Sequence, residues 1–312
     1  MRRRRLGVAP FLGLVAIYLL AAVLAPPSFS TWANIQTIIR QTTIVGILSV
    51  GMTVVIISGG IDLSVGSIIA LTTVAVAYFL QSGSSPLLAA GAGLGVGALC
   101  GLFNGVLIAF FKVGPFIVTL GSLLLVRGMA KGIANEQKID APLSWLNELM
   151  SVLSPDHHWL LVPYGVWILL VSAVAIFVLL RFTRFGLYTF ATGSNENNAR
   201  LCGVPIEGMK VATYALSSTF AGLAGLMQFS RLTVGDPTVA SGIELDAIAA
   251  VVIGGGSLSG GEGSVLGSLV GALIMTTIRS AASHMGLSNW IQEILTGVII
   301  ISAVGMDRLR HR

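Results

Sequence analysis

The sequence predicts an all-α membrane protein of about ten transmembrane helices, or eight to nine if a glycine-rich segment is re-entrant. Three observations predict this class. Hydrophobic residues make up 54% of the chain, charged residues only 10%, and the mean hydropathy is +0.89, whereas soluble domains carry about 25% charged residues. The 71 residues between Arg40 and Lys112 include a single charge, at Asp62. The 38 glycines are typical of membrane helices that pack closely.

Runs of roughly 20 apolar residues define the spans. The first run, 8–25, follows Arg2–Arg5 as a secretory signal would. It is longer than a signal core, and Pro26-Pro27 stands where cleavage would fall, so we interpret it as an uncleaved span. A partly polar helix at 34–44 leads into the second span. The later spans are expected at 42–58, 66–80, 87–111, 115–132, 159–180 and 211–230, on both sides of the glycine-rich segment 254–264, and at 289–305.

One expected span carries glycines at every fourth position, at Gly93, Gly97, Gly101 and Gly105. This spacing places them on one helix face, which predicts close packing against a neighbouring helix. Asn104 lies beside that face, where it can bridge two helices or contact a polar solute. We treat residues 1–312 as a single transmembrane domain.

Asp62 lies in the stretch Ser58–Ser67, where one span gives way to the next among Gly59, Gly60 and Gly66. A carboxylate at membrane depth costs about 2.5–3.5 kcal/mol on insertion scales. A broken backbone is tolerated there only against protein or a wet cavity. The stretch therefore predicts a broken helix beside a polar path; an ordinary interfacial turn is the alternative.

The basic residues predict the orientation. With ten spans and the N-terminus inside, 12 of the 18 Lys and Arg residues lie near span ends on the cytoplasmic side, in line with the positive-inside tendency. Both termini and the connection 181–210 are then cytoplasmic, and the polar insertion 133–158, with an amphipathic piece near 143–153, faces outward. The runs 54–60 and 251–256 resemble each other, as in duplicated transporters. Both end on the same side, so they do not demonstrate an inverted repeat.

Several function classes find no support in the sequence. The net charge of +5 is concentrated at the termini and short loops, so we expect no nucleic-acid partner. Cys100 and Cys202 form no disulfide framework. His157-His158 has no third ligand at metal-site spacing, so we expect no metal. The glycines of 254–261 lack the Gly-Lys-Ser/Thr ending of a phosphate-binding loop. No catalytic set stands on a credible scaffold, so we expect no enzyme.

The connection 181–210 is the most polar one between two full-length spans. Asn195–Leu201 is expected to form a short helix, capped by Ser194 or Asn195 and ended by Gly203. A short exposed helix with one apolar edge is suited to docking into a groove of another protein. The alternative is a solvated loop that orients the neighbouring spans.

Three motifs together resemble a known family. Ser58–Ser67, the connection 181–210 and Glu244–Gly255 are similar to the ribose/galactose-type permeases of ABC sugar importers, and the resemblance covers essentially the whole chain. Through Thr183–Gly186 and the run Ile243–Gly255, the chain looks most like the galactofuranose-type members. It departs from the family at Asn198-Ala199, where a pair of alanines is frequent.

The resemblance implies a noncatalytic permease, without a cofactor of its own, in a bacterial inner membrane. A periplasmic binding protein would deliver a monosaccharide, a second permease (identical or related) would complete the path, and cytoplasmic ATPase domains would use ATP to drive the cycle. Membrane lipid is the remaining partner. The residues that match the family's cytoplasmic loop, and that we expect to serve coupling to the ATPase, are Gly193, Asn195, Glu196, Ala199, Arg200, Leu201 and Gly203.

A sugar is neutral and rich in hydroxyls, so its path should offer spaced hydrogen-bonding groups with little fixed charge. Positions at glycine breaks and on span faces give the candidates Ser58, Asp62, Ser64, Asn104, Thr119 and Ser122. One alternative is a secondary carrier driven by protons or sodium, which broken helices also fit. Another is an ABC permease of the same superfamily for branched-chain amino acids or a signalling furanose.

Overall fold

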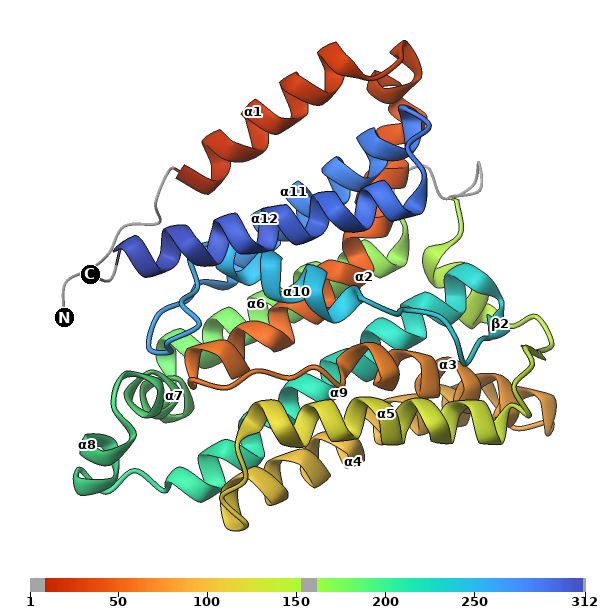
Figure 1. The fold of residues 1–312 in the computed structure, drawn as a ribbon. Coiled ribbons are helices and arrows are strands. Elements are labelled where there is room, and N and C mark those ends of the chain that lie inside the picture. Colours follow the sequence, from red (N-terminus) through yellow and green to blue (C-terminus); the bar gives the residue numbers. More distant parts are fainter. Residues whose placement is uncertain (1–8, 153–161, 311–312) are drawn as a thin grey trace.

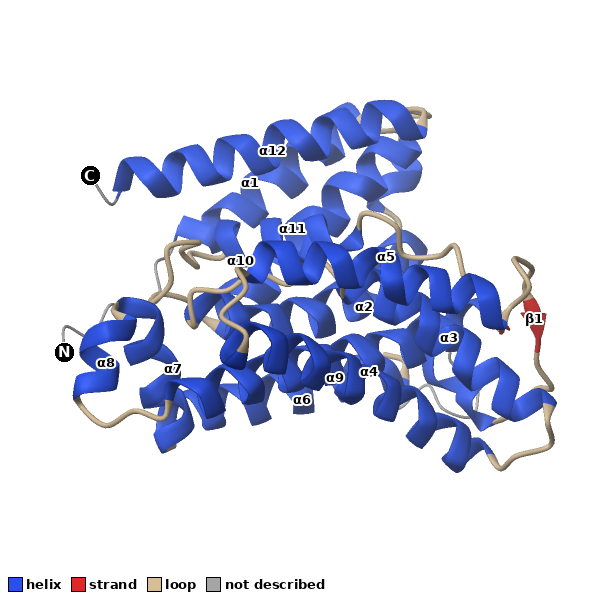
Figure 2. Ribbon diagram, turned by 60° about the horizontal axis from the view of Figure 1, so that its bottom comes forward, coloured by secondary structure: helices blue, strands red, loops and turns tan. Residues whose placement is uncertain are grey.

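The computed structural model describes residues 9–152 and 162–310. The sequence predictions for Arg2–Arg5, His157-His158 and the start of the span 159–180 lie outside these residues. The described chain is almost wholly helical, and one short antiparallel pairing joins β1 to β2 (Figures 1 and 2). In chain order the elements are α1 (Ala9–Leu24), η1 (Pro27–Ser30), α2 (Trp32–Ile57), α3 (Val65–Gln81), α4 (Pro86–Phe110), α5 (Pro115–Ile133), β1 (Ile139–Asp140), η2 (Trp145–Met150), α6 (Tyr164–Phe182), α7 (Arg184–Ser194), α8 (Glu196–Leu201), α9 (Ile206–Leu232), β2 (Val234–Gly235), α10 (Ile243–Ile253), α11 (Val265–His284) and α12 (Asn289–Arg310).

Helix length and composition confirm an all-α polytopic membrane protein. In the described part of the chain, five helices are long and apolar enough to cross a membrane, namely α2, α4, α5, α6 and α11. Shorter apolar helices occur in α1, α3 and α12. Helix α9 has 27 residues, or about 40 Å of length.

Four features differ from the sequence prediction. The partly polar helix at 34–44 and the second span are one continuous helix, α2, which begins after its cap Thr31 and ends before Gly59-Gly60. The span expected before the glycine-rich segment is not a full helix, because α10 has only 11 residues, about 16 Å. The amphipathic piece near 143–153 is the 3-10 helix η2, and the β1–β2 pairing was not predicted.

Two crossings of the bundle are broken part-way; the break within Ser58–Ser67 was predicted, and the one before α10 was not. Non-helical residues at 60–64 precede α3, and residues 236–242 precede α10. Figure 1 shows α3 running away from the end of the bundle that holds α8, and α10 running towards that end. The series α2–α5 and α9–α12 therefore have the same order of elements and opposite directions, an inverted repeat. The resemblance between 54–60 and 251–256 pairs the ends of α2 and α10, which are not equivalent in this repeat.

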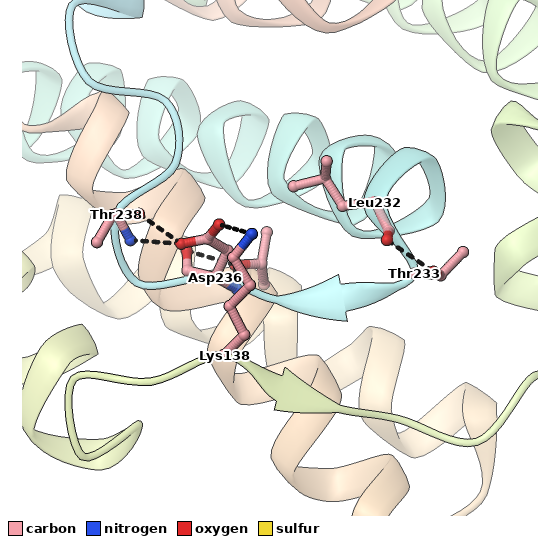
Figure 3. Close-up of polar contacts among 6 residues, drawn as sticks. Lys138, Leu232, Thr233, Asp236 and Thr238 are labelled. Atoms are coloured by element: carbon pink, nitrogen blue, oxygen red, sulfur yellow. Dashed lines mark hydrogen bonds and ion pairs between the residues drawn. The ribbon is translucent and has the colours of Figure 1, made fainter.

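The two broken segments share the same turn. The backbone N and Oγ of Ser64 donate to Oδ1 of Asp62 at 2.9 and 2.6 Å. The backbone N and Oγ1 of Thr238 donate to Oδ1 of Asp236 at 2.9 and 2.7 Å (Figure 3). Each aspartate thus closes a local turn two residues ahead of it. Asp236 also pairs with Nζ of Lys138 at 3.3 Å, whereas Asp62 is completely buried.

The glycine face of α4 packs directly against α9. A Cβ added to Gly97 would overlap the carbonyl of Ser218, and one added to Gly101 would lie 2.7 Å from the Ser218 Cβ. On α9, a Cβ added to Gly222 would lie 3.0 Å from the carbonyl oxygen of Gly93. The predicted close-packing face is confirmed, because only glycine lets the two backbones approach this closely.

One end of the bundle gathers the segments that the basic residues place in the cytoplasm. Figure 1 shows α7, α8, the α4–α5 turn, the start of α1 and the end of α12 at this end, which we call the α8 end. β1 and β2 lie at the opposite end. The connection 181–210 holds more helix than predicted, because α7 precedes α8 and the first turn of α9 follows it.

Candidate translocation and coupling sites

Asp62 is the centre of a buried polar network. Its Oδ2 accepts a hydrogen bond from Oγ of Ser218 at 3.2 Å, in addition to the bonds from Ser64. Nδ2 of Asn104 donates to Oγ of Ser64 at 2.9 Å, and Oγ of Ser122 donates to Oδ1 of Asn104. These bonds join the broken segment before α3 to α4, α5 and α9.

The carbonyl of Ile61 is held by two further side chains. The hydroxyl of Tyr214 donates to it at 3.2 Å, and Oγ1 of Thr119 donates at 3.4 Å. A Cβ added to Gly60 would overlap the Tyr214 hydroxyl, so the position requires glycine. The carbonyl of Ile61 therefore fixes the broken segment to both α9 and α5.

The structure brings together five of the six residues predicted for the path. Their exposed fractions are between 0% and 4%, so they are enclosed in this conformation. Four of them bond to one another in a chain, and Thr119 joins them through the carbonyl of Ile61. Ser58 lies apart, at the end of α2, where its hydroxyl donates to the carbonyl of Val55 at 2.7 Å. The five that meet are Asp62, Ser64, Asn104, Thr119 and Ser122.

Sequence reasoning did not include Tyr214 and Ser218, which lie four residues apart on α9. Residues at this spacing share a helix face, and this face meets the glycines of α4. A tyrosine and a serine at that spacing inside an apolar span could have indicated that both belong to a polar network. The indication is weak, because serine hydroxyls in membrane helices commonly bond to their own backbone.

The short helix α8 has the predicted form. The side chain of Asn195 accepts a hydrogen bond from the backbone N of Asn198 at 2.9 Å, and Gly203 follows the helix with a φ of 83°. Ala199 is buried against α7 and the start of α9, whereas Leu201 is 86% exposed. One side of α8 is therefore fixed, and another presents a leucine to its surroundings.

Ion pairs join α8 to the first turn of α9. Nη1 of Arg200 lies 2.7 Å from Oε1 of Glu207, and Nζ of Lys210 lies 2.7 Å from Oε2 of Glu196. The hydrogen bond from Arg200 holds the pKa of Glu207 below its ordinary value. Beside these pairs is a cavity of about 520 Å³, which Lys112 of the α4–α5 turn also lines. Single exposed pairs contribute little, but this set links α8 to the start of α9.

Gly193, at the end of α7, lies where three glycine-rich segments meet. A Cβ at this position would overlap the carbonyl of Ile57. That carbonyl accepts a hydrogen bond from the N of Gly261 at 2.8 Å, and a Cβ on Gly260 would lie 2.8 Å from the Cα of Gly59. Gly193 therefore serves packing against the end of α2 and the segment 254–264.

Within residues 9–152 and 162–310, no three His, Cys, Asp or Glu side chains are grouped so that they could hold a metal ion. The functional candidates in the described chain are therefore the buried network around Asp62 and the exposed helix α8.

The apolar crossings, two of them broken, and the exposed helix at one end define a polytopic membrane permease. The chain belongs to the family described as "Branched-chain amino acid transport system / permease component", whose profile matches residues 34–304.

Relatives with named substrates are similar over almost the whole chain. The ribose import permease protein of Escherichia coli strain K12 is 38% identical over 300 residues, covering 96% of this chain and 93% of the relative. The ribose import permease protein of Bacillus subtilis is 38% identical over 302 residues, with coverage of 96% and 92%. The fructose import permease protein of Rhizobium meliloti is 35% identical over 308 residues, with coverage of 97% and 85%. No solved structure matches the chain.

Proposed function

We propose that this chain is the permease subunit of an ATP-driven importer, and that with a second permease it forms the path for a monosaccharide delivered by a binding protein. The observation that carries the proposal is α8, which exposes 86% of Leu201 at one end of an otherwise membrane-embedded bundle. Relatives that are permeases for ribose and fructose support a sugar as substrate. The chain needs no cofactor, because the partner ATPase would use the ATP.

The contacts provide a route from α8 to the broken segment. A force on α8 reaches the first turn of α9 through the pairs of Arg200 with Glu207 and of Lys210 with Glu196. Helix α9 carries it to Tyr214, whose hydroxyl bonds to Ile61. Movement of α9 therefore strains the bonds around Asp62 directly. A broken segment that can take two arrangements would convert a small movement of α9 into opening of the path to one side of the membrane or the other.

Two other functions fit the family less well. A proton- or sodium-driven carrier accounts for broken helices, but it has no use for an exposed docking helix. Import of branched-chain amino acids agrees with the family's description, whereas the relatives that are named for a substrate are named for ribose, arabinose and fructose. A preference for galactofuranose remains a prediction from Thr183–Gly186.

Reconstitution tests the proposal. The chain would be co-expressed with the ATPase and binding protein encoded beside it, and the complex placed in sealed vesicles. We expect uptake of a labelled pentose or hexose that requires ATP and the binding protein. Uptake that needs an ion gradient and no ATPase would establish the carrier instead.

For localisation, we propose an inner-membrane protein with both termini and α8 in the cytoplasm. The basic residues of α8 and the α4–α5 turn, Arg200 and Lys112, line one cavity. This supports the orientation, because basic residues favour the cytoplasmic side. A C-terminal tag should be protected from protease added outside intact spheroplasts. A tag that is cleaved from outside would refute the orientation.

A further inference from the structure

Arg127 of α5 is a charged residue within a membrane-spanning helix. Its Nη1 donates to the carbonyl of Val239 at 2.7 Å and to that of Pro237 at 3.1 Å. These carbonyls lie in the broken segment before α10, so the arginine holds this segment against α5. Its side chain is only partly buried, so the guanidinium borders the surface of the bundle.

Glu244, in the first turn of α10, lies close enough to Arg127 for the two charges to interact. Backbone groups of Gly242 and Glu244 hydrogen-bond its carboxylate. A Cβ added to Gly66 would overlap the Glu244 carboxylate, so the two half-helices α3 and α10 meet at this point. Glu244 is partly exposed, and its neighbours Ser241 and Leu245 are exposed.

The depth of this charge pair excludes a lipid environment. Helix α5 has 19 residues, which is about 28 Å and close to the thickness of the hydrocarbon core. Arg127 lies six positions from the end of α5, about 9 Å along it. Its bonds to Pro237 and Val239 direct it towards the broken segment instead of the membrane surface. Charged side chains at such depth are found against protein or a water-filled cavity.

The surrounding surface is apolar. On α5, Leu120, Leu124 and Leu125 are 43%, 68% and 50% exposed. An apolar face that borders two charged groups is unsuited to lipid, and it is suited to a second copy of a membrane protein that encloses a polar channel.

We infer that the surface around Arg127 and Glu244 is the wall of the sugar path, closed on its other side by a second permease. This inference rests on the proposed function. A carboxylate accepts hydrogen bonds from sugar hydroxyls, and a guanidinium donates to sugar oxygens. Together they offer both kinds of bond with no net charge, as a neutral, hydroxyl-rich solute requires. The buried residues around Asp62 then support the break and do not contact the sugar in this conformation.

Cysteine accessibility in the assembled complex tests the inference. The background would be the doubly substituted chain with Cys100→Ala and Cys202→Ser. Glu244→Cys would be compared with Val171→Cys, a position on α6 that is 67% exposed on an apolar helix. The probe is a membrane-impermeant cationic methanethiosulfonate, and the readout is the mass shift of the intact chain in sealed vesicles with ATPase and binding protein.

We expect Glu244→Cys to be modified at least tenfold faster than Val171→Cys. Addition of loaded binding protein and ATP should change the rate at which Glu244→Cys is modified. If Glu244→Cys fails to assemble, Ser241→Cys replaces it in the same comparison. Equal, slow rates at both positions in a complex that still hydrolyses ATP would overturn the inference while leaving the proposed function intact. Absence of sugar uptake by the unmodified complex would instead refute the proposed function.

Discussion

Substitution of Gly101 by alanine tests how closely α4 and α9 must approach. The added Cβ would overlap the carbonyl oxygen of Tyr214 and lie 2.7 Å from the Ser218 Cβ, where an ordinary contact begins at 3.4 Å. The Ser218 contact alone requires the two helices to separate by about 0.7 Å, and the overlap with Tyr214 requires more. The displacement also lengthens the bond of 3.2 Å from Ser218 to Asp62, so the effect reaches the polar network.

The magnitude follows from two opposing contributions. Overpacking a tight contact costs typically about 1–3 kcal/mol, and alanine in place of a helical glycine recovers about 0.5–1 kcal/mol. A net loss of about 1–2 kcal/mol lowers the apparent Tm by about 2–8 °C, at about 2–4 °C per kcal/mol for a large domain. The assay heats the purified permease in detergent and measures the fraction that remains folded by size-exclusion chromatography.

Gly95 provides the matched control on the same helix, because a Cβ there would meet nothing within 4 Å. Gly95→Ala should leave the Tm unchanged or raise it slightly. If Gly101→Ala were as stable as Gly95→Ala, the α4–α9 packing described here would be incorrect.

Two further substitutions separate support of the fold from transport. Asp62→Asn should keep assembly, because the amide can still accept a hydrogen bond from Ser64 and donate one to a serine hydroxyl. Asp62→Ala should lower the free energy of unfolding by about 1–3 kcal/mol, because it leaves buried donors unpaired. Equal stability of the two variants in denaturant would contradict a structural role of Asp62. Gly193→Ala should lower the yield of folded permease, because its Cβ would overlap the carbonyl of Ile57. The control is Gly208→Ala, which has open space around it and should keep the yield. Equal yields of the two variants would contradict the packing of Gly193 against the end of α2.

Much of the fold follows from patterns in the sequence. The apolar runs predicted most of the helices, and the four-residue spacing of Gly97 and Gly101 predicted the α4–α9 seam. The capping of α8 by Asn195 and its end at Gly203 also follow from local rules of helix termini. These features depend on near neighbours in the chain, so a single sequence contains them.

What the sequence did not reveal depends on contacts between distant segments. The equivalence of Asp62 and Asp236 was missed because the resemblance between 54–60 and 251–256 was more apparent, although the shared pattern of an aspartate two residues before Ser or Thr is present in both segments. The shortness of α10 was missed, although Asp236 and Pro237 interrupt the apolar run before it. Arg127 carried the same signal as Asp62, a charge inside an expected span, and was not used.

The candidate path residues show the same limit. Their residue types predicted a polar cluster at a break, and the structure gathers five of them. Whether such a cluster is open to water or enclosed depends on the side chains of α9, which no local pattern specifies. Tyr214 and Ser218 enclose it here.

The most direct test of the coupling role of α8 is substitution of its exposed leucine. Burial of one leucine in a partner groove is worth about 1.5–3 kcal/mol, so Leu201→Asp should weaken binding of the ATPase by at least tenfold or uncouple ATP hydrolysis from sugar uptake. The control is Leu143→Asp, which changes a leucine that is 82% exposed on the segment leading to η2 and should leave ATPase binding intact. The measurement is stimulation of ATP hydrolysis by the loaded binding protein in the reconstituted complex. We expect loss of stimulation in Leu201→Asp with a folded permease; full stimulation and normal uptake would contradict the proposal that α8 transmits the ATPase cycle.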